Sequence, residues 1–272
     1  MPTSSPNRVA LFIAVMAAAI AVSGFAHAFD AKSIEKEKKS PWAVFRLGFS
    51  AYKKGDKEEA VEAYRYAADK GQVGASWKLA KMYAAGDGVE RDDYQAYKFF
   101  RQIVEDDVRP GSPDESYVSD ALVALGNYSR TGIPGSPVAP DLSAAQDFYM
   151  RAAASYRNPV AQYELGKMFL NGDGVKASIK QAGRWLQLAA EKGHAGAQAT
   201  LGNLLFQSGK IVRGLAMMTE ALSHAPAADL PWIRQMQEEA FALAGEGDRR
   251  TAIALADSMR DGGDSSSGSD DK

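Results

Sequence analysis

The sequence has no cysteine, and this absence limits both its fold and its chemistry. A chain without cysteine forms no disulfide bonds and offers no thiolate to a metal, so core packing must hold its fold. Only three histidines occur among 272 residues. A transition-metal site needs three or four ligands from His, Cys or carboxylates, so we predict no metal site.

Short catalytic and nucleotide-binding motifs are missing as well. The chain has no G-x-S-x-G turn, no H-E-x-x-H pair and no phosphate-binding loop. Asp87 and Asp173 lie in G-D-G-V segments, but neither segment supplies the alternating oxygen ligands and final Glu of a calcium loop. We therefore predict no catalytic residue and no cofactor site. An envelope hydrolase, the alternative from another class, would need two converging titratable groups, for which the sequence offers no candidate.

No excess of positive charge is present. The chain carries 32 basic and 34 acidic residues, for a formal net charge of −2. Such a balance argues against a nucleic-acid partner, which would demand a basic surface. The basic cluster at residues 32–39 alternates with Glu35 and Glu37, so we interpret residues 29–40 as a flexible, solvated N-terminal extension.

The first residues have the pattern of an export signal. A positive start at Arg8 precedes an almost unbroken apolar run over residues 9–25, and Ala26-His27-Ala28 follows with small residues at the two positions that signal peptidase recognises. We predict cleavage between Ala28 and Phe29, and hence a periplasmic protein. An uncleaved membrane anchor is the alternative, for which the apolar run is barely long enough.

The last residues, 261–272, read DGGDSSSGSDDK and hold no apolar side chain to bury. We predict a disordered acidic tail there. The expected organisation is therefore a cleaved signal peptide at 1–28, an extension at 29–40, a folded unit at 41–260 and the tail.

The folded unit repeats itself. Residues 79–89 read LAKMYAAGDGV and residues 165–175 read LGKMFLNGDGV. A third copy has LGNY at 125–128, and weaker copies have Leu-Gly at 47–48 and 201–202. Repetition with a period in the thirties to forties predicts stacked helical units with an extended surface. Such a surface favours protein binding over catalysis.

Each repeat reads as helix, glycine loop, helix, stop. In the best copy, Gly172 and Gly174 permit positive φ and end the first helix, and Ser178 is suited to cap the second. Gly86 and Gly88 are the equivalent loop glycines one copy earlier. We predict helix pairs at 41–54 and 56–70, 73–85 and 92–105, 115–131 and 141–156, 158–171 and 178–192, 195–208 and 210–224, and a degenerate capping pair at 229–244 and 248–260.

Two proline-containing loops interrupt the pattern, at 106–116 and 132–141. Insertions in a solenoid often project from the binding face, although tolerated loop variation explains them equally well. If the protein is controlled by proteolysis, these loops are the predicted cleavage sites.

The repeat pattern, from about Trp42 to Ala225, resembles the Sel1-like repeat, a relative of the tetratricopeptide repeat. The Gly-Asp-Gly-Val loops carry that resemblance, because plain tetratricopeptide units lack this extended glycine turn. The resemblance implies an all-α, right-handed α-solenoid of helix-turn-helix repeats.

With its signal peptide, about five repeats, no cysteine and an acidic tail, the whole chain resembles the periplasmic negative regulators of exopolysaccharide production of rhizobia and related alphaproteobacteria. The resemblance implies binding to the periplasmic domain of a membrane sensor histidine kinase. It further implies repression of that two-component system, relieved when periplasmic proteases remove the regulator. The repeat itself indicates only protein binding, so a periplasmic scaffold for polysaccharide export or cell-wall machinery is the alternative.

Some side chains carry narrower expectations. Phe99 and Trp185 occupy equivalent repeat positions and should be buried, whereas Tyr66, Tyr94 and Tyr97 lie off the core stripe and are candidates to face a groove.

The resemblance suggests a response to acid. His194 and His224 are the histidines outside the signal, and His is the side chain that titrates near mildly acidic pH. Buried carboxylates with raised pKa are the alternative sensors.

Overall fold

The computed structural model describes residues 40–105 and 111–264, which fold into twelve helices with no strand in these ranges. The expected signal, nearly all of the expected extension and residues 265–272 of the expected tail lie outside the described residues. The helices in chain order are α2 (Pro41–Lys54), α3 (Lys57–Asp69), α4 (Val73–Ala85), α5 (Asp93–Glu105), α6 (Glu115–Thr131), α7 (Leu142–Ser155), α8 (Pro159–Asn171), α9 (Ile179–Ala190), α10 (Ala195–Gln207), α11 (Ile211–His224), α12 (Leu230–Leu243) and α13 (Glu246–Asp264).

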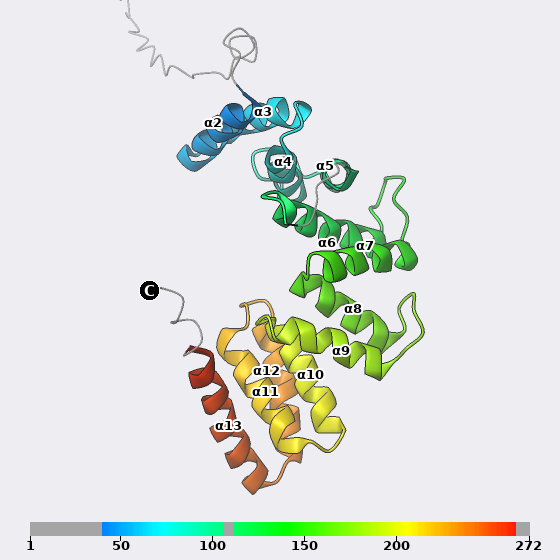
Figure 1. The fold of residues 1–272 in the computed structure, drawn as a ribbon, viewed down its shortest axis with the longest axis vertical. Helices are drawn as coiled ribbons and strands as arrows, with labels where there is room; N and C mark the ends of the chain where they lie inside the picture. Colours follow the sequence, from blue (N-terminus) through cyan, green and yellow to red (C-terminus); the bar gives the residue numbers. More distant parts are fainter. Residues whose placement is uncertain (1–39, 106–110, 265–272) are drawn as a thin grey trace, which may run out of the picture.

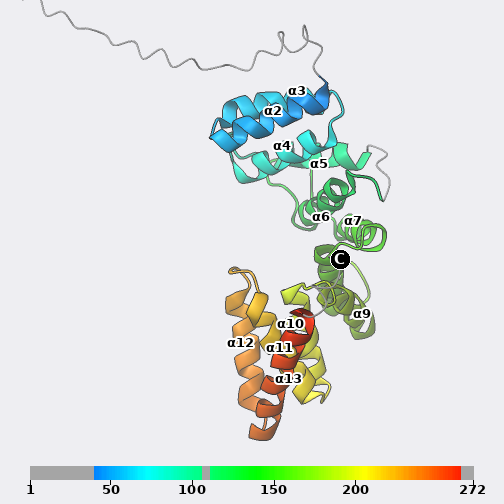
Figure 2. The same cartoon turned by 60° about the vertical axis from the view of Figure 1, so that its left-hand side comes forward.

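The helices form hairpins that stack into a curved solenoid, which confirms the predicted fold class. Helices pack mainly on their neighbours in the chain. In Figure 1 the stack is a crescent, with α4 and α6 nearer the hollow side than α5 and α7. Figure 2 shows the same stack from another side, with α2 and α3 at one end and α10 to α13 at the other.

Local sequence explains where the helices begin and end. Ser178 accepts a hydrogen bond from the Gln181 amide at 3.3 Å, so it caps α9 as predicted. At the start of α3, Asp56 accepts from the Glu59 amide at 3.2 Å. Most predicted boundaries fall within about two residues of the observed ones, which is the ordinary uncertainty of helix ends.

Within a hairpin, a glycine in the first helix lets the second helix approach closely. A Cβ added at Gly126 would lie 2.4 Å from Tyr149 Cε1, and one at Gly166 would lie 2.7 Å from Leu186 Cδ2. Gly48 has the same relation to Tyr64, at 2.8 Å. The opposing side chain fills the place where a Cβ would stand, so a larger residue at these three positions would force the ring or the helix to shift.

The expected burial of Phe99 and Trp185 is wrong. Both are only partly buried, whereas their successors Phe100 and Leu186 are 3% and 0% exposed. One residue turns the side chain by about 100° around a helix, and it is the second position that points at the preceding helix. Phe99 instead stacks on Tyr83, with ring centroids 5.8 Å apart.

The last two helices depart from the regular stack. Both α12 and α13 pack on α11, where Leu215 and Met218 meet Ala240, Ala252 and Ala256. They close the solenoid by covering α11 rather than by forming one more hairpin. The backbone of α13 continues to Asp264, so residues 261–264 of the predicted tail are helical. The boundary at residue 261 was inferred from composition. A helix whose inner face is packed can continue through polar residues, because its backbone hydrogen bonds are local.

Among the described residues, no helix has both the length and the apolar character needed to cross a membrane.

Two glycine variants test the close approach. Gly126→Ala should lower the free energy of unfolding by about 1–3 kcal/mol, because the new methyl group overlaps the Tyr149 ring. Gly183→Ala, in α9, should raise it by about 0.5–1 kcal/mol, because no heavy atom lies within 4 Å of the new Cβ and alanine favours the helix. Urea unfolding of both variants measures these effects. Equal effects at the two positions would refute this account of hairpin packing.

Candidate protein-interaction surface

The loop glycines fix how one repeat sits on the one before it. Gly86 and Gly172 have φ of 69° and 79°, and Gly88 and Gly174 have 76° and 69°. A Cβ at Gly88 would lie 2.6 Å from Lys57 Cβ, where Lys57 begins the second helix of the preceding hairpin. Gly174 has the same relation to its counterpart there. The second loop glycine is therefore required both by its backbone angle and by the lack of space.

Leu142 is that counterpart at Gly174, and the added Cβ would lie 2.8 Å from Leu142 Cβ. The two loops thus repeat one packing arrangement with different side chains. Their glycines position neighbouring repeats and touch no ligand-binding group.

Asp87 ties its loop to the first hairpin. Its carboxylate accepts a hydrogen bond from the Tyr52 hydroxyl at 2.5 Å and another from the Lys57 ammonium. These bonds, that from Lys57 foremost, lower the pKa of Asp87 below its usual range. Asp173 accepts instead from the Asn171 side chain at 3.2 Å. Within the described ranges, no three His, Asp or Glu side chains come together as a metal site would require.

His194 begins α10 and caps it. Its Nδ1 accepts a hydrogen bond from the Ala197 amide at 3.2 Å, and its ring lies 4.5 Å from the Tyr163 ring. Burial lowers the pKa of His194, although Asp229 and Glu164 oppose that effect. The cap bond requires an unprotonated Nδ1, so acid removes it.

The other acid-sensitive candidates lie elsewhere. His224 ends α11 with its Nδ1 3.4 Å from a Glu220 carboxylate oxygen. Burial raises the pKa of Glu220, and it also raises that of Asp120 on α6. A raised carboxyl pKa makes the folded state bind protons more readily than the unfolded state, so protonation of these two groups stabilises the fold. Of these groups, His194 is the one whose pKa shift makes acid destabilising.

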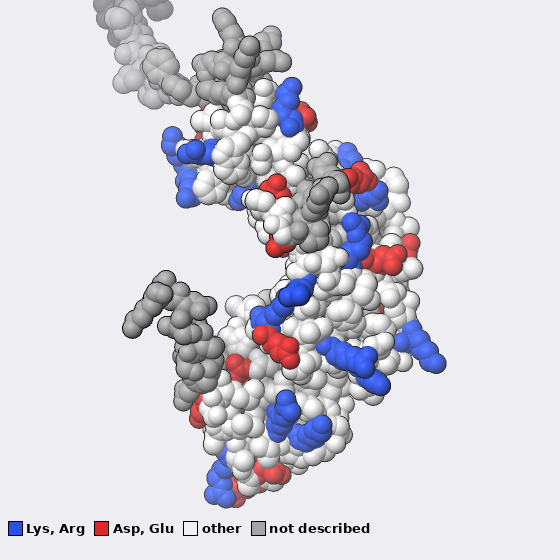
Figure 3. Space-filling model, viewed as in Figure 1, with Lys and Arg blue, Asp and Glu red and all other residues white. Residues whose placement is uncertain are grey.

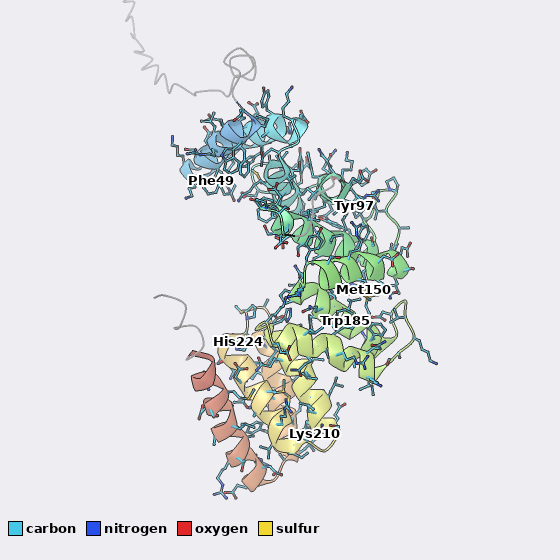
Figure 4. The ribbon with its side chains drawn as sticks, viewed as in Figure 1. Phe49, Tyr97, Met150, Trp185, Lys210 and His224 are labelled. Carbon is cyan, nitrogen blue, oxygen red and sulfur yellow. The ribbon has the colours of Figure 1, made fainter. Side chains whose placement is uncertain are left out.

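Lysines lie over aromatic rings on α2 and α4, which the sequence analysis missed. The Lys53 ammonium is 4.7 Å from the centre of the Phe49 ring, and Lys78 is 5.5 Å from that of Trp77. Trp77 in turn lies 5.4 Å from Tyr117 on α6. The signal was available, because neither α2 nor α4 contains an acidic residue. In Figure 4, Phe49 lies beside the hollow, at the end of its upper arm.

A cleft lies between the glycine loop after α4 and the proline loop at 132–141. Arg91, Asp93, Tyr94 and Ile133 line it. Of the three tyrosines expected to face a groove, Tyr94 lines this cleft.

The other two tyrosines do not line that cleft. Tyr97 stacks on Tyr94 and meets Tyr128 edge-on at 6.3 Å, and Figure 4 shows it on the outer side of the crescent. Tyr66 lies under Lys70, with the ammonium 5.8 Å from its ring centre.

The match to a known repeat family coincides with the observed hairpins. The Sel1 repeat model matches residues 43–72, 73–106, 119–155 and 159–194, which correspond to the first four hairpins. The α10–α11 hairpin, which the structure also shows, lies beyond the matched residues.

Two curated relatives match over nearly their full length. The exopolysaccharide production negative regulator of Rhizobium leguminosarum bv. viciae is 48% identical over 92% of this chain and 93% of its own. The protein of that name in Rhizobium meliloti (strain 1021) is 46% identical over 93% and 94%.

Solved structures share the fold. The protective antigen c5321 of uropathogenic Escherichia coli, which has an SLR fold, superposes with a TM-score of 0.65 at 25% identity over 82% of this chain. This chain spans under half of that antigen, 46% of its length. A Sel1 repeat protein from Oxalobacter formigenes gives a TM-score of 0.59 at 23% identity, over 82% of this chain and 90% of its own.

Replacing His194 tests the acid effect. Below about pH 6.5, the ordinary histidine pKa, the unfolded state binds a proton at this residue more readily than the folded state, so stability falls as the pH falls. His194→Asn keeps a capping side chain that does not titrate. The melting temperature of this variant should fall less than that of the unmodified protein between pH 7.5 and 5.0. His224→Asn is the matched control and should keep the full acid effect, whereas an unchanged acid effect in His194→Asn would contradict the assignment.

Proposed function

Because this chain belongs to the family of Sel1-repeat negative regulators of exopolysaccharide production, we propose that it represses exopolysaccharide synthesis by binding a membrane sensor histidine kinase. It acts in the periplasm after its signal peptide is removed between Ala28 and Phe29. The partner surface is the periplasmic sensor domain of the kinase. The observation that carries this proposal is the similarity to two relatives of that name, which are 48% and 46% identical over nearly their full length. The Sel1-repeat solenoid also offers the extended surface that repeat proteins use for binding.

The mechanism is mass action. A regulator that binds the inactive conformation of the sensor, and not the active one, shifts the sensor population toward the inactive state. The shift lasts only while free regulator exceeds its dissociation constant, so removal of the regulator releases the kinase. Periplasmic proteases supply that removal. The space-filling view shows the hollow side of the solenoid as an indentation, which is the side we assign to the partner domain (Figure 3).

A crosslinking pull-down tests the partner. Tagged protein crosslinked in its own envelope at neutral pH should recover a sensor histidine kinase, and deletion of the gene should increase exopolysaccharide. Recovery should fall as the pH falls, because the lowered pKa of His194 makes acid destabilising at this cap. Recovery of only polysaccharide-export or cell-wall components would replace the kinase proposal with the scaffold alternative.

The two proline loops differ in their resistance to cleavage. In the loop at 132–141, the Ile133 amide donates to the Val138 carbonyl at 2.8 Å and the Asp141 amide to the Ser129 carbonyl at 2.6 Å. Ile133 is only 7% exposed. A protease must extend its substrate, so this loop would have to give up these contacts before cleavage. The described end of the other loop exposes Gly111 with open space around it.

Limited proteolysis should therefore cut within 106–116 before 132–141. Mass spectrometry of the first fragments, at a low ratio of protease to protein, identifies the site. A protease of broad specificity is required, so that sequence preference does not decide the order. A first cut within 132–141 would show that its hydrogen bonds do not protect it.

A further inference from the structure

Positive charge collects on the first two inner helices. Helices α2 and α4 together hold five cations and no carboxylate: Arg46, Lys53, Lys54, Lys78 and Lys81. The next inner helices are mixed, with two acids and one cation on α6 and one of each on α8, while α10 has no charged residue. The protein as a whole is slightly acidic. In Figure 3, blue atoms gather on the arm formed by the first hairpin, beside the hollow.

Aromatic rings hold three of these lysines in place. Lys78 lies 5.7 Å from the Phe49 ring centre and 5.3 Å from that of Tyr52, in addition to its contact with Trp77. Lys81 lies 6.0 Å from the Trp77 ring centre. We call the set Phe49, Tyr52, Lys53, Trp77, Lys78 and Lys81 the lysine–aromatic face. Ammonium groups held by cation–π contacts lose less side-chain entropy on binding than free ones.

The charge of this face is not neutralised within the described residues. No carboxylate oxygen there lies within ion-pairing distance of Lys53, Lys78 or Lys81. The nearest acids are Asp87, which binds Tyr52 and Lys57, and Asp120, an exposed carboxylate on α6 that attracts Lys81 without forming an ion pair. These two acids offset only part of the charge of Lys53, Lys78 and Lys81, so the face presents a net positive field beside the hollow.

Exposed apolar area adjoins the charge. Phe49 is 39% exposed, and Trp42, two turns before it along α2, is 54% exposed. Large exposed apolar side chains rimmed by charges are typical of a protein-binding surface.

We propose that the lysine–aromatic face binds an acidic, extended segment of a protein partner. This inference rests on the proposed function, in which the segment belongs to the sensor domain of the kinase. Carboxylates of the segment pair with Lys53, Lys78 and Lys81, and its apolar side chains cover Phe49 and Trp42. A flat membrane surface does not fit a face turned toward a hollow. Sugar rings need open aromatic faces for stacking, and ammonium groups already lie over the rings of Phe49, Tyr52 and Trp77.

Charge reversal on this face tests the proposal. The full mature protein carrying Lys78→Glu and Lys81→Glu is titrated with the purified sensor domain by calorimetry. Its affinity should fall by roughly tenfold or more, and the salt dependence of binding should weaken, because ion pairs at the contact are lost. The control carries Lys70→Glu and Lys98→Glu. These lysines also lie over tyrosine rings, at 5.8 and 5.1 Å, but belong to the end of α3 and to α5.

The control changes the net charge by the same amount and should bind like the unmodified protein. A neutral variant, Lys78→Gln with Lys81→Gln, guards against the case in which the introduced glutamates, close to Asp87, unfold the first hairpin. It should also bind more weakly, with an unchanged melting temperature. If the unmodified protein binds the sensor domain and the face variants bind equally well, this inference is wrong and the proposed function stands. If the unmodified protein does not bind the sensor domain, the proposed function fails and the inference fails with it.

Two other anions test the class of ligand. Polygalacturonate represents acidic polysaccharide, and phosphatidylglycerol vesicles represent a membrane surface. Neither should bind the unmodified protein detectably at physiological salt. Binding of either that disappears in Lys78→Glu with Lys81→Glu, while the sensor domain still binds this variant, would overturn the assignment to an acidic protein segment.

Discussion

The close approach of two helices at a residue without a side chain is the constraint on which this structure depends. At Gly48, Gly126 and Gly166, the opposing Tyr64, Tyr149 or Leu186 occupies the volume that a Cβ would fill. That contact sets the spacing of these three hairpins, and the glycine loops after α4 and α8 set the spacing to the hairpin before each of them. The curve of the stack, and with it the hollow beside which the lysines lie, follows from these two repeated distances.

Most of the fold could be predicted because the repeat encodes it locally. Periodicity located the helices, and glycine and capping residues located their ends, all from interactions only a few residues apart. The expected burial of Phe99 and Trp185 failed because a one-residue rotation decides which side chain meets the neighbouring helix. The packing of α13 on α11 was not predictable either, since an amphipathic pattern shows that a helix has an apolar face without naming its partner.

The candidate site was the least predictable part. The loop glycines were identified correctly as residues that allow positive φ, yet they act in packing between repeats. The lysine–aromatic face joins residues from two successive hairpins, and its charge becomes visible only when each helix is counted separately. Whole-chain composition conceals it, because the acids of α3 balance the cations of α2. For a solenoid, charge should therefore be counted by helix and by side of the stack.

The chain of neighbour-to-neighbour contacts has a mechanical consequence. Apart from α4 with α6, α8 with α10 and the capping helices, the described helices pack mainly on the elements before and after them. A small rotation at each junction therefore adds to the next, and the opening of the hollow changes while every hydrophobic contact is kept. The width of the hollow is therefore adjustable, and a bound domain fixes that width.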